Sequence, residues 1–564
     1  MIPRGDTLVR ILAHRLERDP DRTAIVVVSG EREIPLTMRR LGEAALAYAI
    51  RYRREGITPG EVIVDLLRPG EDLLYSYLGA LIYGAIPCIL PFDTEKMAPT
   101  RYRENIISLM SITHPAGLVA ERGLAAELRA TLPHDPGLKA ILERIEDPMA
   151  TGDPGAWEGA SRTSESIALL QHSSGTTGLQ KGVALSHRAV VNQLGAYAPA
   201  LRLEPDDVIV SWLPLYHDMG LIAGFLMPLL LGIKLVLLSP FEWVRAPWSL
   251  MQAVSRHRGT LSWLPNFAYN FCAHRVLDRN LNGVDLSSWR AVINCSEPMY
   301  AASHRLFAER FAAFGLRRES LATCYAMAEN VFAVSQGGIG APVRLDRVDA
   351  NSLEQDRIAI PAAESSRRVV EGVSAGPPLL NCRIRIEDDQ GRQLGERCVG
   401  QIALQSDCML TGYYNRPDAT ESAMREGWFL TGDLGYFAEG EIFITGRKKD
   451  LIIVGGKNIF PQDLEELIHQ VRGVHPGRVV VFGVHNPDLG TEEVAAVAEI
   501  DPCTPVNRGS LGLEVRKAVA ARSDVVIRHL LLVDDRWLVK TSSGKLARAA
   551  NREKFLAELG RVGP

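Results

Sequence analysis

Residues 62–90, VIVDLLRPGEDLLYSYLGALIYGAIPCIL, contain the pattern of a strand, a helix and a second strand in immediate succession. Apolar residues recur at helical spacing over 71–83, and Gly84 predicts the end of that helix. The short apolar runs at 62–64 and 85–90 predict the flanking strands. Strands that alternate with helices are typical of α/β folds, because a helical crossover can join parallel neighbours. We therefore predict an α/β protein whose sheets are largely parallel.

The same alternation of strands and helices continues along the chain. Residues 23–28 predict a further strand, and the apolar run 219–233 predicts a buried helix that is followed by a strand at 235–238. This apolar run is shorter than the roughly 18–20 residues that a membrane-spanning helix needs. We therefore expect no transmembrane segment.

A boundary between two parts of the chain is predicted near Gly446. A strand at 451–454 and a helix from Pro461 follow this glycine, and further strands are predicted at 479–482 and 530–533. The residues after the boundary, about 115 of them, are enough for a small α/β domain of their own.

The composition of the 564-residue chain excludes several classes of protein, but it does not indicate which reaction or ligand the protein serves. Hydrophobic residues make up 46% and charged residues 23%, which excludes overall disorder. The net charge of −4 lacks the positive excess of a dedicated nucleic-acid binder. The eight cysteines form no C-x-x-C pair, so we expect reduced core thiols. The N-terminus lacks the apolar core of a signal peptide, and we expect a cytoplasmic protein.

A loop rich in glycine and hydroxyl groups, His172-Ser-Ser-Gly-Thr-Thr-Gly-Leu-Gln-Lys-Gly182, follows an apolar strand predicted at 167–170. Its glycines permit unusual backbone angles, while its hydroxyls, its N–H groups and Lys181 can bind anionic oxygens. The loop lacks the Gly-Lys-Ser/Thr of a Walker motif. Judged alone, it fits a phosphate-binding loop only slightly better than a flexible turn of the same composition.

The segment Ser173–Gly182 closely resembles the nucleotide loop of the adenylate-forming (AMP-binding) superfamily, which includes acyl-CoA synthetases and fatty acyl-AMP ligases. Five further segments resemble motifs of this superfamily and occur in the family's order: Asn294–Pro298, Tyr325–Glu329, Thr431–Asp433, Gly446–Asp450 and Lys540–Lys545. The resemblance implies a large N-terminal adenylation domain of stacked, mainly parallel sheets with helices at 1–446. It also implies a small, mobile C-terminal α/β lid domain at 447–564.

The reaction that the resemblance implies has two steps. A carboxylic acid and ATP form acyl-AMP and pyrophosphate, and a thiol then takes the acyl group. The first step joins two anions, so it needs cations where charge develops. Lys545 carries over as the catalytic cation, and Thr177 as a catalytic hydroxyl near the phosphates and the metal. Glu329 carries over as a ligand of Mg²⁺, which prefers hard carboxylate oxygens. Outside their motifs, Lys545 and Glu329 are more simply interpreted as solvated residues.

The contacts to the nucleotide are also implied by the resemblance. Asp433 is expected to accept hydrogen bonds from both ribose hydroxyls, and Arg447 to contact ribose or phosphate. Tyr325 is expected to lie against adenine, although a core aromatic is nearly as good an interpretation. Ala326 replaces the glycine that the family usually has there. The full set of expected ATP and AMP contacts is Ser173, Ser174, Gly175, Thr176, Thr177, Gly178, Lys181, Ser296, Glu297, Pro298, Tyr325, Ala326, Met327, Asp433 and Arg447.

Lys449 stands at the hinge position of the family, where the small domain reorients between the two half-reactions. A hinge residue must absorb large changes in its backbone dihedral angles. A charged surface loop is the simpler interpretation of this segment, and the two interpretations are compatible.

The segment Trp212-Leu-Pro-Leu-Tyr-His-Asp-Met-Gly-Leu221 resembles fatty acyl-AMP ligases particularly well. The resemblance places His217 beside the acyl carbonyl as a catalytic group, and Met219 and Asn266 in the acyl pocket. The surroundings are apolar, as a pocket for a fatty chain requires, but they also fit a protein core. His217 outside this motif fits a structural histidine about equally well. The Phe-Asp opening of amino-acid-activating domains is absent, so amino-acid activation ranks low.

The stretch between Glu329 and Gly376 is longer than in typical acyl-CoA synthetases, and its residues 342–372 are unusually polar. This part resembles the insertion that marks fatty acyl-AMP ligases and restricts their domain motion or use of CoA. We therefore predict that a fatty or similarly apolar acid is activated as acyl-AMP. Its acyl group is then transferred to the phosphopantetheine thiol of a separate acyl-carrier protein. CoA as the acceptor is the close alternative. A nucleotide-binding protein without catalysis is the less favoured one.

Overall fold

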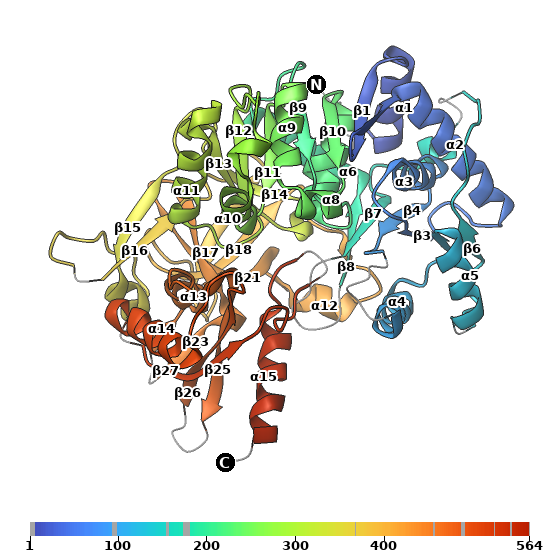
Figure 1. Ribbon diagram of the computed structural model, residues 1–564. Helices are drawn as coiled ribbons and strands as arrows, with labels where there is room; N and C mark the ends of the chain where they lie inside the picture. Colours follow the sequence, from blue (N-terminus) through green and yellow to red (C-terminus); the bar gives the residue numbers. More distant parts are fainter. Residues whose placement is uncertain are drawn as a thin grey trace.

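The computed structural model describes residues 6–92, 99–132, 134–153, 157–172, 181–366, 368–454, 457–486, 491–523, 525–541 and 544–562. Two large sheets, with helices on their faces, form the N-terminal region of this described part (Figure 1). Across the first sheet the strands are β14 (Ala333–Gly337), β13 (Leu321–Ala326), β12 (Ala291–Cys295), β11 (Leu261–Leu264), β9 (Val208–Ser211), β10 (Lys234–Leu238), β1 (Thr23–Ser29) and β2 (Arg32–Thr37). Across the second they are β19 (Gly412–Tyr413), β8 (Gly182–Ser186), β7 (Ile167–His172), β4 (Ile86–Ile89), β3 (Val62–Leu66), β5 (Gly117–Ala120) and β6 (Ala140–Glu143).

Both large sheets are mainly parallel, which confirms the predicted fold class. In the first sheet, neighbouring strands from β13 to β1 are parallel, and the edge strands β14 and β2 are antiparallel to their neighbours. In the second sheet, β7, β4, β3, β5 and β6 are parallel, whereas β8 is antiparallel to both of its neighbours.

The strand–helix–strand pattern of residues 62–90 is confirmed. Strands β3 and β4 lie side by side and parallel, and helix α3 (Glu71–Tyr83) connects them. Gly84 ends the helix with φ +87°, a left-handed conformation that glycine adopts without the steric penalty of a Cβ atom. The helix is buried along most of its length because it is apolar on nearly every side.

The apolar run 219–233 differs from the single helix that we predicted. It divides into the π-helix η3 (Met219–Leu226) and the short helix α7 (Met227–Leu231), and β10 follows. Every residue of η3 is buried. A hydropathy pattern does not distinguish i→i+5 from i→i+4 hydrogen bonding, so the sequence could not predict this division. π-helical turns are frequent at functional sites, and η3 begins two residues after His217.

A third sheet is antiparallel and is formed by later strands of the chain. Its strands are β17 (Cys382–Glu387), β18 (Gly400–Ser406), β21 (Trp428–Ala438), β20 (Met424–Arg425) and β22 (Glu441–Arg447). Strand β22 pairs with β21 and leads directly into the short helix η9 (Lys448–Asp450). The predicted boundary near Gly446 therefore falls at the end of a strand.

The C-terminal domain is the smaller orange and red unit in the lower part of Figure 1. Its strands are β23 (Ile452–Val454), β24 (Lys457–Ile459), β25 (Val474–Asn486), β26 (Thr491–Ile500) and β27 (Ile527–Val533). Its helices are α13 (Pro461–His469), α14 (Arg508–Arg522) and α15 (Arg548–Val562). Buried side chains from β25, β26, β27, α13 and α14 form a separate hydrophobic cluster, as expected of a domain.

The polar segment 342–372 folds into two paired strands, β15 (Leu345–Asp349) and β16 (Val369–Val373), with the π-helical turn η8 (Ser352–Asp356) between them. Leu353 of this segment belongs to a buried cluster that also contains Phe460 of the C-terminal domain. Segment 342–372 therefore contacts the C-terminal domain through this cluster.

The cysteines are free, as expected, but not all of them lie in the core. Six are buried, Cys398 is half-buried and Cys503 is exposed. Among the described residues, every helix is too short or too polar to cross a bilayer.

Candidate active site

Lys545 extends from the C-terminal domain to the N-terminal region. Its Nζ lies 3.5 Å from Nε2 of His217, which precedes it by 328 residues. A turn holds this lysine in place: its backbone N–H donates to the hydroxyl oxygen of Thr541, and Gly544 in the turn adopts φ +86°. The structure therefore brings together two of the side chains that we predicted to be catalytic.

Asp218 orients the ring of His217. Its Oδ1 lies 2.6 Å from Nδ1 of the histidine, and the two side chains are 9% and 15% exposed. A proton on Nδ1 is donated to this carboxylate, which leaves Nε2 as the acceptor that faces Lys545. The same Oδ1 accepts the backbone N–H of Met219 at 2.8 Å, so the carboxylate is itself fixed.

Two carboxylates, the buried Asp218 and the half-buried Glu297, lie close enough to Lys545 to act on its charge. Burial lowers the pKa of Lys545, and Glu297 and Asp218 oppose this shift. Burial raises the pKa of Glu297, whose Oε2 accepts the backbone N–H of Phe267 at 2.9 Å. The pKa of Asp218 lies below its ordinary value. Burial alone would raise this pKa, but the attraction of His217 and Lys545 outweighs the effect of burial. Glu297, which we expected at adenine, thus also lies within electrostatic reach of Lys545.

Tyr325, Asp433 and Arg447 form a second cluster. The Tyr325 hydroxyl donates to Oδ2 of Asp433 at 2.6 Å, and Nε of Arg447 lies 3.3 Å from Oδ1. Asp433 and Arg447 are opposite each other on β21 and β22, which explains their proximity. The structure thus brings together three of the predicted nucleotide contacts, although Tyr325 and Asp433 are 108 residues apart.

Glu329 and Lys181 are joined through a side chain that the sequence analysis missed. The hydroxyl of Tyr413 donates to Oε1 of Glu329 at 2.9 Å, and Nζ of Lys181 lies 4.4 Å from the centroid of the Tyr413 ring. Glu329 lies in the short helix η7 (Ala328–Asn330), directly after β13. The predicted metal ligand and the predicted phosphate-binding lysine are therefore close together.

Backbone strain occurs at two places in the predicted nucleotide segments. Ser296, directly after β12, has φ +68°, and Val331, two residues after Glu329, has φ +63°. A left-handed backbone is a genuine outlier for a residue branched at Cβ, such as Val331. Such strain typically persists where a site needs a fixed geometry.

The residues expected in the acyl pocket are buried. The Asn266 side-chain oxygen accepts from Asn294 at 2.9 Å and from the Tyr300 N–H at 3.2 Å, and its amide donates to Ser303 at 3.1 Å. This side chain is therefore bonded within the protein. Met219 is the first residue of η3 and is 3% exposed.

The remaining predicted site residues lie next to elements already described. Ala326 ends β13 and Met327 follows it, and Pro298 lies two residues after Ser296. Lys449 is exposed and lies in η9, between the two domains.

The phosphate loop itself, with Ser173, Ser174, Gly175, Thr176, Thr177 and Gly178, lies outside the described residues. The residues on either side of it are described. His172 at the end of β7 pairs with Gly182 at the start of β8, so the two ends of the loop are adjacent.

The donor set fits a magnesium ion that arrives with a phosphate substrate. Among the residues that the structure describes, no three His, Cys, Asp or Glu side chains gather as a metal cage. Glu329 supplies one carboxylate near Lys181, through their shared neighbour Tyr413. Mg²⁺ commonly takes one or two protein carboxylates together with substrate phosphates and water.

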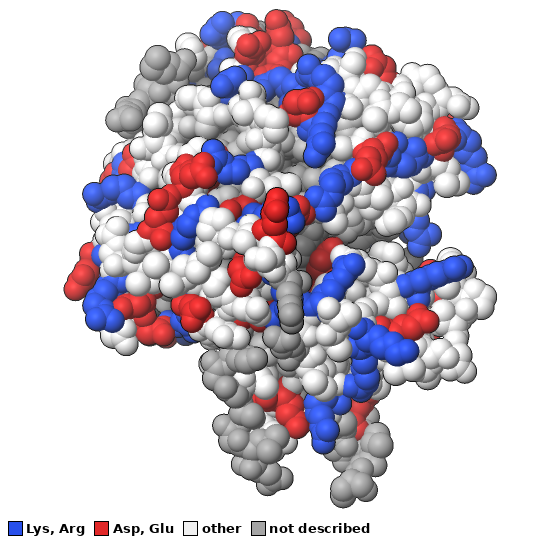
Figure 2. All heavy atoms as spheres, turned by 90° about the vertical axis from the view of Figure 1, so that its left-hand side faces the viewer, with Lys and Arg blue, Asp and Glu red and all other residues white. Residues whose placement is uncertain are grey.

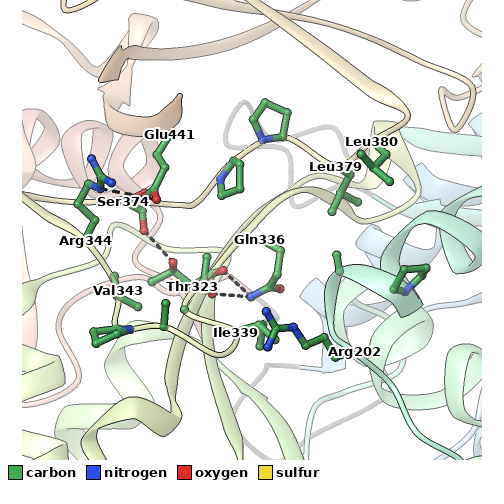
Figure 3. A pocket seen from close by; sticks show the side chains of 18 of the residues that line it. Arg202, Thr323, Gln336, Ile339, Val343, Arg344, Ser374, Leu379, Leu380 and Glu441 are labelled. Carbon is green, nitrogen blue, oxygen red and sulfur yellow. Dashed lines mark hydrogen bonds and ion pairs between the residues drawn. The ribbon is translucent and has the colours of Figure 1, made fainter. Parts of the chain in front are cut away.

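A cavity of about 370 Å³ lies apart from these residues, along β13 and β14 (Figure 3). Several of its polar side chains are bonded within the protein: Gln336 donates to the Thr323 carbonyl at 2.9 Å, and the Ser374 hydroxyl to Glu441 at 2.5 Å. None of the predicted site residues within the described part of the chain lines it. The predicted catalytic, ribose-binding and metal-binding side chains that the structure describes lie instead in the clusters around Lys545, Asp433 and Glu329.

Basic and acidic side chains are mixed over the face of the molecule shown in Figure 2. A nucleic-acid interface would instead gather positive charge on one surface. The mixture agrees with the net charge of −4.

Asp218 and Tyr413 are the residues of these clusters that the sequence analysis did not assign. Asp218 could have been found, because a carboxylate next to a candidate catalytic histidine is a common orienting partner. Tyr413 follows Glu329 by 84 residues, and nothing in the local sequence indicates their contact.

Comparison with known proteins identifies the family. The family described as AMP-binding enzyme matches residues 12–414. The medium-chain-fatty-acid–[acyl-carrier-protein] ligase JamA of Moorena producens is 30% identical, over 98% of this chain and 96% of that protein. The long-chain-fatty-acid–AMP ligase FadD26 of Mycobacterium marinum is 28% identical, over 97% of each chain. A structure from a study of fatty acyl-adenylate ligases from E. coli and L. pneumophila matches with a TM-score of 0.88 and 26% identity over the whole of both chains. The chain belongs to the AMP-binding enzyme family.

Proposed function

We propose that this protein uses ATP to activate a fatty or similarly apolar carboxylic acid as acyl-AMP, with release of pyrophosphate. It then transfers the acyl group to the phosphopantetheine thiol of an acyl-carrier protein. The observation that carries the proposal is the 3.5 Å approach of Lys545 Nζ to His217 Nε2. JamA and FadD26, named as ligases of fatty acids, support the substrate class.

The first step needs positive charge where the carboxylate oxygen attacks the α-phosphorus and pyrophosphate leaves. Lys545 supplies that charge at the end of a turn fixed by Thr541. His217 borders the acyl carboxylate, and Asp218 keeps its Nε2 directed at the lysine. An ammonium group held in advance costs little reorganisation when charge develops.

The nucleotide is bound at the two other clusters. Tyr325 lies against adenine, with Ser296, Glu297 and Pro298 along the same edge. Asp433 and Arg447 hold the ribose, and Ala326 and Met327 complete the nucleotide contacts. Lys181 and the loop residues 173–178 bind the phosphates, with Thr177 near the metal. Glu329 would hold Mg²⁺, which neutralises phosphate charge when bound.

The second step requires the C-terminal domain, 447–564, to rotate against 1–446 about Lys449. The inserted segment 342–372 opposes this motion through direct contacts. Arg357 donates to the side-chain oxygen of Asn458 at 3.0 Å, Asn458 donates to the Glu354 carbonyl at 3.2 Å, and Arg368 donates to the Arg522 carbonyl at 3.0 Å. JamA, which is named as a ligase to an acyl-carrier protein, supports a carrier protein as the acceptor. We also propose that the enzyme works in the cytoplasm.

The test is ATP–pyrophosphate exchange with purified protein, Mg²⁺ and a panel of acids that includes octanoate, palmitate, benzoate and phenylalanine. We expect exchange that depends on an apolar acid, with AMP as the product in the presence of a thiol acceptor. Exchange with phenylalanine alone, or turnover of ATP to ADP, would contradict the proposal. ATP binding without exchange for any acid would instead support a non-catalytic protein.

A further inference from the structure

Tyr413 is the side chain that contacts both Glu329 and Lys181. Its hydroxyl donates to Oε1 of Glu329 at 2.9 Å, and the ammonium of Lys181 lies 4.4 Å from the centre of its ring. Tyr413 is 7% exposed, so its ring and hydroxyl are largely shielded from water. One residue thus holds the two groups that would act on the phosphates and on their metal.

The backbone around Tyr413 fixes it in this position. Strand β19 pairs with β8, so that Tyr413 is opposite Val183, two residues after Lys181. The Leu410 N–H donates to the carbonyl of Glu329 at 2.8 Å, and the Tyr414 N–H donates to the carbonyl of Gly182 at 2.7 Å. The segment 410–414 therefore bridges the helix that carries Glu329 and the end of the phosphate loop.

We propose that Tyr413 is a positioning residue for the metal-bound triphosphate, and this inference rests on the proposed function. The hydroxyl fixes the direction of the Glu329 carboxylate toward the metal. The ring seats the Lys181 ammonium by a cation–π contact, which leaves its N–H donors available to the phosphates. The two contacts are chemically separable, because phenylalanine keeps the ring and removes the hydroxyl.

Because the hydroxyl and the ring make different contacts, Tyr413→Phe and Tyr413→Leu have different expected results. In Tyr413→Phe, the Mg²⁺ concentration for half-maximal exchange rises by roughly 10-fold, the scale of losing an orienting partner of a metal ligand. The KM for ATP at saturating Mg²⁺ stays within about 2-fold. In Tyr413→Leu, the Mg²⁺ requirement rises as in Tyr413→Phe, and the KM for ATP also rises by about 5-fold, as expected from the loss of a partly desolvated cation–π contact.

A binding measurement tests the same point without turnover. The melting temperature is recorded with ATP alone and with ATP plus Mg²⁺, and the difference reports the metal-dependent part of binding. We expect this difference to shrink in Tyr413→Phe and to be unchanged in Tyr414→Phe. Tyr414 is the matched control, because it neighbours Tyr413 and packs its ring against a separate hydrophobic cluster.

Specific outcomes would overturn the inference. An unchanged Mg²⁺ requirement in Tyr413→Phe, with an unchanged metal-dependent shift in melting temperature, rules out the positioning role. If Tyr413→Phe and Tyr413→Leu lower the exchange rate to the same extent, and both also lower the melting temperature of the ligand-free protein, Tyr413 has a packing role only. If the wild type exchanges with no acid, the proposed function fails, while the binding measurement still tests Tyr413.

Discussion

The Nζ of Lys545 lies 3.5 Å from Nε2 of His217, so the C-terminal domain closes directly on the predicted acid-binding residue. This arrangement makes Lys545 the group best placed to stabilise charge in the first half-reaction. Lys545→Ala is expected to lower pyrophosphate exchange by at least ~10²-fold, the scale of losing one transition-state donor. Lys517→Ala is the control, because Lys517 is exposed on α14. Near-normal exchange by Lys545→Ala would remove Lys545 from the mechanism.

Asp218 is expected to act through the orientation of His217. Asn at this position can donate to Nδ1 and so favours the tautomer with its proton on Nε2, which turns a donor toward Lys545. Asp218→Asn should therefore lower kcat by about 10²-fold while the KM for ATP changes less than about 2-fold. Steady-state exchange kinetics measure both constants. A rise in the KM for ATP with kcat preserved would show that Asp218 serves nucleotide binding instead.

The backbone at Lys449 is expected to matter for the second step more than for the first. Proline fixes φ near −65°, which restricts the change that a hinge has to make. Lys449→Pro should thus impair acyl transfer to the thiol more than adenylation, by about 10-fold or more. Single-turnover transfer from preformed acyl-AMP and pyrophosphate exchange are compared on the same protein. Equal losses in the two assays would count against a hinge.

The contact between Arg357 and Asn458 is expected to restrain the C-terminal domain. Arg357→Ala removes a 3.0 Å hydrogen bond between the inserted segment and that domain. A hydrogen bond contributes about 1 kcal/mol, which corresponds to roughly a 5-fold change in a two-state population. Acyl-CoA formation should rise by that factor while adenylation is unchanged, as measured by mass spectrometry. A fall in both rates would indicate a structural role for Arg357.

The buried Asp65 is expected to make stability depend on pH. It is fully buried on β3, accepts a hydrogen bond from Ser76, and burial raises its pKa to about 8. Because this pKa lies above the unfolded value, the folded state binds the extra proton. The stabilisation is complete below about pH 4 and is lost as the pH rises through 8, at up to about 1.4 kcal/mol per pH unit. Melting temperatures from pH 5 to 9 should fall less steeply in Asp65→Asn. An identical slope in the two proteins would show that Asp65 stays ionised.

Local pattern predicted much of the fold and of the candidate site. Helix α3 is confirmed at Glu71–Tyr83, because its spacing and the terminating Gly84 lie within one short stretch. The motifs likewise supplied Lys545, His217, Asp433 and Arg447, which the structure places in two clusters.

Other features could not be predicted, since they depend on contacts between distant parts of the chain. The contact between Tyr413 and Glu329 arises from the register of β19 on β8. The packing of the inserted segment against Phe460 depends on where the C-terminal domain docks. The π-helical turn of η3 depends on hydrogen bonding that apolar residues do not specify.

A competition between the two acceptors tests the proposed reaction directly. The wild-type protein is incubated with ATP, Mg²⁺ and a medium-chain fatty acid, and with a holo-acyl-carrier protein and CoA in equal amounts. Intact-protein and small-molecule mass spectrometry then follow both acceptors. We expect acylated carrier protein together with AMP and pyrophosphate. Accumulation of acyl-CoA with the carrier protein unmodified, or formation of ADP, would contradict it.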